Sequence, residues 1–150
     1  MPSELCGTPI SQQALELLLP PGDELTVRKA QGMSDSYVRC SLDVDDEYIL
    51  SSRIDWAKKN ETTIEVAKYH WEPRFTQSLQ GASKLEYSSL GGVGAVECAN
   101  PKLEHRKNLQ LYVSIAVRDG KERAKEDVKA LLLAYQKSVG ESTLCRRTAS

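Results

Sequence analysis

The stretch that decides the fold is residues 37–56, YVRCSLDVDDEYILSSRIDW. Apolar and polar side chains alternate before Asp45-Asp46 and again after it, which is the period-two pattern of half-buried antiparallel strands. The two aspartates form a polar turn between the strands. We therefore predict a pair of antiparallel strands here. Its alternating rows are Val38, Cys40, Leu42 and Val44 on the first strand and Tyr48, Leu50, Ser52, Ile54 and Trp56 on the second.

The same alternation recurs on both sides of this pair. Residues 25–30 form one further strand pattern, and residues 85–87 and 93–98 form two more around Gly91-Gly92. The cleanest alternation lies at residues 109–117, which we predict to be the central core strand. Residues 76–83 show no such alternation, so they are predicted to be a loop.

Two helices are predicted near the ends of the chain. Ser11 is a good N-cap for residues 12–19, and Pro20 ends that helix. Residues 121–139 carry apolar side chains at three- and four-residue steps, which is typical of an amphipathic helix. Gly140 ends the second helix.

The middle of the chain fits either a helix or a strand. Thr62 or Thr63 would cap a helix over residues 62–71, which we favour because Ala67 and Lys68 suit a helix better. The fold class expected from the whole pattern is α+β. We predict a twisted, mainly antiparallel sheet of about six strands, with the N-terminal, middle and C-terminal helices packed on one face.

Length and charge limit the classes of protein to consider. The 150 residues fit a single domain, 1–150, with a core over about residues 5–145. The 20 Lys and Arg against 21 Asp and Glu give a net charge of −1, which argues against a nucleic-acid partner. No apolar run approaches the roughly 20 residues of a membrane helix. Membrane contact is therefore expected only through an anchor outside these residues.

The four cysteines favour disulfides over a zinc site. They lie far apart without a C-x-x-C pair, and neither of the two histidines stands near a cysteine in sequence. Two disulfides are the favoured interpretation, and four buried thiols are the alternative. The residues concerned are Cys6, Cys40, Cys98 and Cys145, with His70 and His105.

Disulfides imply export to an oxidising compartment. The start Met1-Pro2-Ser3-Glu4 has no basic, apolar or cleavage region of a signal peptide. We therefore expect Met1 to begin an excised ectodomain whose signal or membrane anchor lies upstream. If Met1 is the native start, the protein is cytosolic and the disulfide argument fails.

Several scattered motifs resemble those of a group of bacterial domains. They are Cys6-Gly7 before a short helix, Leu18-Leu19-Pro20 near a glycine, Arg39-Cys40 in a strand, Gly92-Val93-Gly94-Ala95-Val96-Glu97-Cys98, and a long helix ending near Cys145. On these the chain resembles small secreted or membrane-anchored α+β domains of actinobacteria, whose function is generally unassigned. The resemblance is one of pattern and spans most of the chain.

This resemblance implies an envelope location and the pairs Cys6 with Cys40 and Cys98 with Cys145. Spacing alone allows three connectivities for four cysteines. The resemblance supplies no catalytic residue.

Two segments invite ligand-binding interpretations that their details do not support. Residues 43–47 are acidic, but a calcium loop also needs a glycine and a distal glutamate, so a solvated hairpin turn is favoured. The run Gly91-Gly92-Val93-Gly94 lacks the Gly-Lys-Ser/Thr of a phosphate loop. Glycines that permit a bulge or tight turn explain it adequately. We predict no metal site and no cofactor.

One short segment combines aromatic and cationic side chains, which are enriched in binding hot spots. We predict that it borders the functional surface, and core packing is the alternative for its tryptophan. The residues are Tyr69, His70, Trp71, Arg74 and Phe75.

The function predicted from these features is a non-enzymatic extracellular or cell-envelope module that recognises a protein, peptide or small ligand. No Gly-x-Ser-x-Gly elbow is present, and no catalytic residue is assigned. One alternative is an uncharacterised hydrolase with His70 as its catalytic group, and another is a purely structural adaptor domain.

Overall fold

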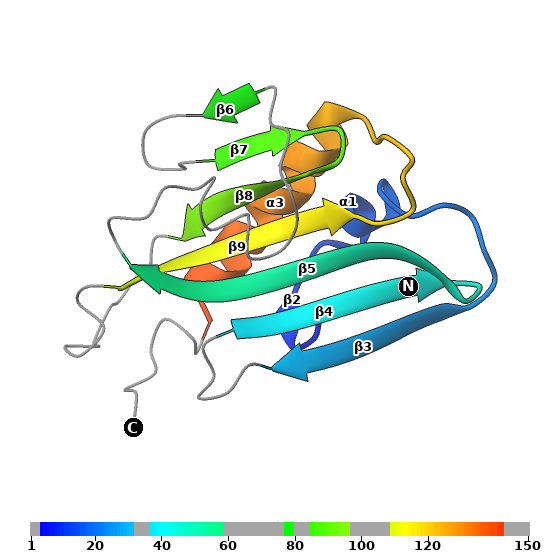
Figure 1. Cartoon of the computed structure of the whole chain (residues 1–150), viewed down its shortest axis with the longest axis horizontal. Coiled ribbons are helices and arrows are strands. Elements are labelled where there is room, and N and C mark those ends of the chain that lie inside the picture. Colours follow the sequence, from blue (N-terminus) through cyan, green and yellow to red (C-terminus); the bar gives the residue numbers. More distant parts are fainter. Residues whose placement is uncertain (1–3, 32–36, 59–76, 80–84, 97–108, 143–150) are drawn as a thin grey trace.

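The computed structural model describes residues 4–31, 37–58, 77–79, 85–96 and 109–142, and it has an α+β fold (Figure 1). A seven-stranded antiparallel sheet runs in the order β3-β4-β5-β9-β8-β7-β6 through this part of the chain, and β1 and β2 form a separate hairpin. The strands are β1 Glu4–Leu5, β2 Thr8–Pro9, β3 Leu25–Gln31, β4 Tyr37–Val44, β5 Glu47–Lys58, β6 Gln77–Leu79, β7 Leu85–Ser88, β8 Gly91–Val96 and β9 Leu109–Val117. The helices are α1 Gln12–Glu16 and α3 Lys125–Gly140.

The predicted strands form, but β8 begins at Gly91 instead of residue 93, and the sequence did not predict β1 and β2. The predicted hairpin forms β4 and β5, and β9 lies in the middle of the sheet between β5 and β8, as expected of the central strand. The loop predicted over residues 76–83 is wrong for Gln77–Leu79, which pair with β7 as the edge strand β6. Three residues are too short for an alternation to be visible in the sequence.

The two described helices lie on the same face of the sheet, behind it in Figure 1. The Oγ atom of Ser11 accepts a hydrogen bond from the N–H of Ala14 at 3.3 Å, as its predicted N-cap role requires. The helix ends sooner than predicted, because Leu17 and Leu18 continue as turns before Pro20. The predicted middle helix over residues 62–71 lies outside the described residues, so three-helix packing stays a prediction.

The long helix begins four residues later than predicted because a side-chain clamp holds the preceding loop. The guanidinium of Arg123 donates to the carbonyl of Leu18 at 2.7 Å and to the carboxylate of Asp119 at 2.7 Å and 3.1 Å. The Asp119 side chain is 1% exposed. The clamp therefore ties the β9–α3 loop to the end of α1.

Neither described helix is long and apolar enough to cross a membrane.

The helix α3 packs closely on β8 because two glycines face it. A Cβ on Gly92 would collide with Leu132 and would lie 2.7 Å from the carbonyl oxygen of Glu86. A Cβ on Gly94 would collide with Gln136. Gly92 and Gly94 therefore lie inside a strand and serve helix packing, instead of the bulge or tight turn expected from the sequence. The expected turn role holds for Gly91, which follows the turn at Ser89-Leu90 and has a positive φ of 142°. The side chains that α3 buries are Val128, Leu131, Leu132, Tyr135 and Val139.

A disulfide joins the N-terminal segment to the sheet. Cys6 and Cys40 are bonded, with 5.8 Å between their Cα atoms and 34 positions between them in sequence. This confirms the first of the two predicted pairs. In the chain-entropy model, a loop of that length stabilises the fold by roughly 4 kcal/mol. Cys98 and Cys145 lie outside the described residues, so the second pair stays a prediction.

Candidate functional site

The surface predicted from the sequence cannot be placed. Tyr69, His70, Trp71, Arg74 and Phe75 all lie outside the described residues. The described residues instead bring together a different set of aromatic and cationic groups on the outer face of β3, β4 and β5, which is the face turned away from α3.

A β-bulge in the β4–β5 hairpin creates this arrangement. Leu42 pairs with Leu50, but the next residue of β4, Asp43, pairs with Tyr48, so Ile49 is an extra residue on β5. The bulge turns Tyr48 to the outer face, while both Ile49 and Leu50 are buried. The sequence had placed Tyr48 and Leu50 in one row, and this is wrong because the extra residue breaks the period of two.

The bulge is held by the chain that follows β9. The backbone N–H of Arg118 donates to the carbonyl of Ile49 at 2.8 Å. Its guanidinium Nε donates to the Oγ of Ser51 at 3.0 Å. The arginine therefore satisfies the carbonyl of the extra residue and at the same time brings a positive charge to the neighbourhood of Tyr48.

An open hollow of about 430 Å³ lies at this place, and we call it the Tyr48 hollow. Three neighbouring strands contribute to it, so it exists only once the sheet is assembled. The residues that line it are Arg28 and Lys29 of β3, Arg39 and Ser41 of β4, and Tyr48 of β5.

Three guanidinium groups converge on Tyr48. The Nη2 atom of Arg39 donates to the phenol oxygen at 2.9 Å. The guanidinium carbon of Arg28 lies 5.4 Å from the centre of the ring, and that of Arg118 lies 5.9 Å from it. Both distances are within the range of cation–π interactions. The tyrosine is therefore surrounded by positive charge.

One carboxylate, that of Asp43, partly balances these cations. Asp43 accepts a hydrogen bond from Arg28 at 3.0 Å, but the Arg28 side chain remains 57% exposed. The Nε of Arg39 is buried and has no hydrogen-bond partner in the described structure. A buried donor without an acceptor is unfavourable, so an additional acceptor would stabilise this corner of the sheet.

The pKa of Tyr48 reflects this charge. Partial burial acts to raise it, but hydrogen bonds with Ser41, Ser51 and Arg39 outweigh that effect, and the charge of the arginine lowers it further. The resulting pKa is about 8, against an ordinary value of 10.0. Groups that favour a phenolate also favour other anions, so the same environment suits a bound carboxylate or phosphate.

A second polar pair lies further along β5. The Nε of Arg53 donates to both carboxylate oxygens of Asp55, at 2.9 Å and 3.0 Å, and its guanidinium lies 4.1 Å from the ring centre of Tyr37. Asp55 is buried, and burial raises its pKa to about 6 although the charge and hydrogen bond of Arg53 act to lower it. Perturbed carboxylates of this kind occur both at functional sites and in structural ion pairs.

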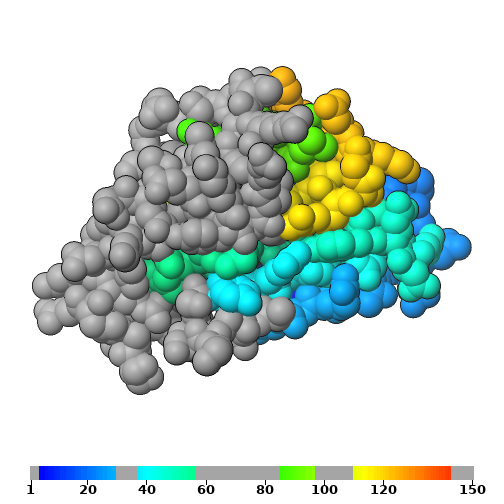
Figure 2. Space-filling view, in the orientation of Figure 1, coloured from blue at the N-terminus to red at the C-terminus, as the bar shows by residue number. Residues whose placement is uncertain are grey.

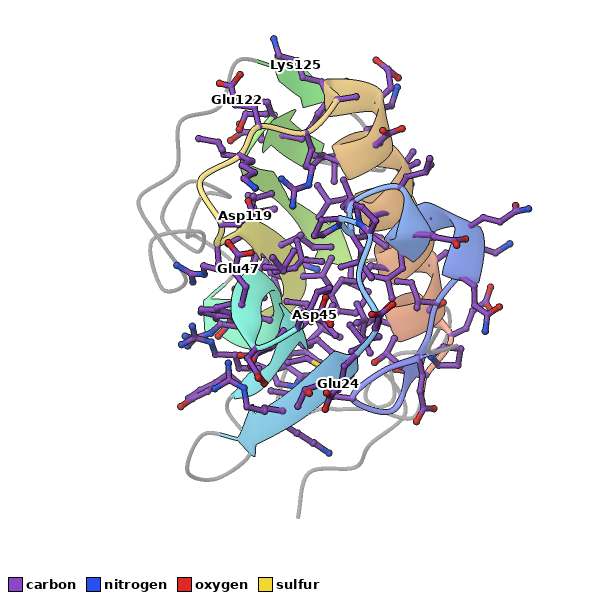
Figure 3. The ribbon with its side chains drawn as sticks, turned by 90° about the vertical axis from the view of Figure 1, so that its right-hand side faces the viewer. Glu24, Asp45, Glu47, Asp119, Glu122 and Lys125 are labelled. Atoms are coloured by element: carbon purple, nitrogen blue, oxygen red, sulfur yellow. A yellow bond between two sulfur atoms is a disulfide. The ribbon has the colours of Figure 1, made fainter. Side chains whose placement is uncertain are left out.

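Acidic residues gather at one end of the sheet, where the β4–β5 turn and the β9–α3 loop meet (Figure 3). The carboxylate of Asp45 is already used: it accepts hydrogen bonds from the N–H of Glu24 at 2.8 Å and of Asp23 at 3.1 Å. Asp45 and Asp46 have positive φ angles of 49° and 66°, which confirms the predicted hairpin turn. Within the part of the chain that the structure describes, no three His, Cys, Asp or Glu side chains lie together as metal ligands would.

No protein-family model matches this chain, and no curated protein or solved structure is significantly similar to it. The site is therefore interpreted from its own geometry.

Proposed function

We propose that this chain is a non-enzymatic binding module of an extracellular or cell-envelope protein and that it holds an anionic group in the Tyr48 hollow. The observation that carries this proposal is the convergence of Arg28, Arg39 and Arg118 on one tyrosine. Arginine offers a planar set of donors that matches the oxygens of carboxylates and phosphates.

The groups around Tyr48 suit binding better than catalysis. They supply positive charge and hydrogen-bond donors, whereas hydrolysis in addition needs a base beside a nucleophile. The hydrolase alternative depended on His70, which lies outside the described residues. The purely structural adaptor is one of the outcomes of the experiment below.

The proposed location has one structural support. The disulfide between Cys6 and Cys40 is typical of proteins in oxidising compartments. Together with the resemblance to secreted or membrane-anchored actinobacterial domains, it favours the cell envelope. The proposed partner is a protein, peptide or small molecule that carries negative charge.

Titration of the protein with inorganic phosphate and with glutarate, followed by amide chemical shifts, tests this proposal. We expect the largest shifts at Arg28, Lys29 and Tyr48, and weaker binding at higher salt. Arg39→Gln should weaken binding about tenfold because a charged hydrogen-bond donor is lost. Lys137→Gln, on the exposed part of α3, is the matched control and should leave binding unchanged.

Three outcomes would overturn the proposal. They are an equal loss of binding in both variants, shifts confined to residues 69–75, and no binding of either anion. The second outcome would instead support the surface predicted from the sequence, and the third would leave the adaptor as the better account.

A further inference from the structure

We infer that the ligand of this module is an acidic peptide segment that adds as a further strand along the free edge of β3 and places a carboxylate in the Tyr48 hollow. This inference rests on the proposed function, since it names the class of molecule that carries the anionic group. Four features of β3 lead to it.

The first feature is an open edge. In the described part of the chain, β3 is the outermost strand of the sheet and has β4 on one side only. Val27 is 41% exposed and the Arg28 side chain is 57% exposed. In Figure 2, atoms of β3 are in view along the lower rim of the molecule, below those of β4 and β5. An exposed strand edge is a template for another chain.

The second feature is the direction of the main-chain groups of β3. The N–H of Asp45 donates to the carbonyl of Glu24 at 2.8 Å, next to the pair Leu25 and Val44. Since hydrogen-bonded and non-hydrogen-bonded pairs alternate in an antiparallel ladder, Leu25 belongs to a non-hydrogen-bonded pair. The N–H and C=O groups of every second residue therefore point away from β4. These residues are Leu25, Val27, Lys29 and Gln31.

The third feature is the position of the Tyr48 hollow at this edge. Arg28 and Lys29 are consecutive residues of β3 and both line the hollow. A chain paired with β3 therefore runs directly beside it. The seven residues of β3 span about 23 Å at ~3.3 Å per residue, which accommodates a short extended segment.

The fourth feature is the alternation of side chains along the edge. Val27 presents an exposed apolar side chain, and its neighbour Arg28 presents a cation on the opposite face of the strand. The complementary strand carries acidic residues at every second position and small apolar residues between them. Acidic side chains then face the arginines of the hollow, and apolar ones cover Val27.

A second copy of this chain fits the same edge poorly. Antiparallel pairing of two β3 strands about their middle residue, Arg28, would place the Arg28 side chains of the two copies directly opposite each other. Like charges opposite each other on paired strands are destabilising. An acidic peptide converts the same contact into an attractive one.

Three seven-residue peptides test the inference on the unaltered protein. The first alternates glutamate and valine, the second replaces its glutamates with glutamines, and the third keeps the charges but replaces its central valines with prolines, so it cannot pair along its length. The readouts are binding affinity and hydrogen exchange of the amides of Leu25, Val27 and Lys29.

We expect the first peptide to bind at least about tenfold more tightly than the other two. It should also slow the exchange of the three outward amides about tenfold or more, because they gain hydrogen-bond partners. If the proline peptide binds as tightly as the first, the hollow binds anions without strand addition, and the inference fails while the proposed function stands. If neither charged peptide nor inorganic phosphate binds, both fail. Protection of these amides that rises with protein concentration alone would assign the edge to a second copy.

Discussion

The two halves of the sheet differ in what covers their outer face. Around β8 and β9 both faces are buried: Val113 on the inner face is 0% exposed, and Tyr112 on the outer face is 5% exposed. Around β4 and β5 the inner face is also buried, as at Cys40 and Leu50, but the outer face carries half-exposed tyrosine and arginine side chains, such as Tyr48 and Arg39. The β8–β9 half is therefore buried on both faces, and the other half presents polar and charged side chains to solvent.

The sequences of the strands reflect this difference. In β4, apolar and polar residues alternate strictly, as expected when only one face is buried. In β8, glycine, valine and alanine fill every position, and all six residues are buried. The alternating strand β4 thus has one face that is partly open to solvent, whereas β8, with its small residues, is buried on both faces.

The largest effect on stability, which would sharpen the comparison between the two halves of the sheet, is expected where α3 packs on β8. Leu132→Ala should lower the free energy of unfolding by about 2–5 kcal/mol, because it leaves a cavity against Gly92. Leu133→Ala, next to it on α3 and 37% exposed, is the control and should cost about 1 kcal/mol or less. Urea melts measure both. Equal costs would contradict the packing described for α3.

An intermediate effect is expected for the buried carboxylate of the other half. Folding raises the pKa of Asp55 to about 6, so the folded state binds more protons than the unfolded state between about pH 4 and pH 6. The free energy of unfolding should therefore fall by on the order of 2 kcal/mol as the pH rises through this range. Asp55→Asn should remove this decline.

The measurement for Asp55 is the difference between wild-type and Asp55→Asn melts at each pH. Carboxylates whose pKa is lowered by folding, such as Asp119, make the protein less stable as the pH falls. They are present in both proteins, so their contribution cancels in the difference. A difference that stays constant between pH 4 and pH 7 would show that Asp55 is not perturbed.

The smallest effect on stability, and the most specific to the Tyr48 hollow, is the titration of Tyr48. Absorbance at alkaline pH should show a tyrosine that ionises with a pKa of about 8. Tyr48→Phe should abolish this step, and Arg39→Gln should move it upward because a hydrogen bond and a positive charge are lost. Lys137→Gln should leave it in place. The cationic character of the hollow is refuted if the step is unchanged by Arg39→Gln.

Much of the fold follows from the sequence because it depends on local pattern. Alternation predicted β4, β5 and β9, and three- and four-residue steps predicted α3 apart from its start. The start of α3 was missed because it depends on the clamp formed by Arg123. One of its contacts, with the carbonyl of Leu18, joins residues more than 100 positions apart. The strand order, which inserts β9 between β5 and β8, is likewise not encoded in any local pattern.

The candidate site escaped prediction for the same reason. Arg28, Arg39, Tyr48 and Arg118 are far apart in sequence and meet only when β3, β4, β5 and β9 align. One signal was present: a two-residue turn at Asp45-Asp46 pairs Asp43 with Tyr48, which places the tyrosine on the same face as Arg39 and Ser41. Period-two counting from Leu50 gives the opposite face, and only the bulge reconciles the two.

The extra residue at Ile49 has a consequence for comparing this chain with others. Without the extra residue, a homologous hairpin would keep its tyrosine on the outer face, because the tyrosine would then directly precede Leu50. A hairpin that kept Ile49 but formed no bulge would carry the tyrosine into the core, even if every side chain around the hollow were identical. Identity at position 48 is therefore not informative by itself. Related hairpins that keep the hollow are distinguished from those that have lost it by the length of the segment between the Asp45-Asp46 turn and Leu50, taken together with whether a bulge forms within that segment.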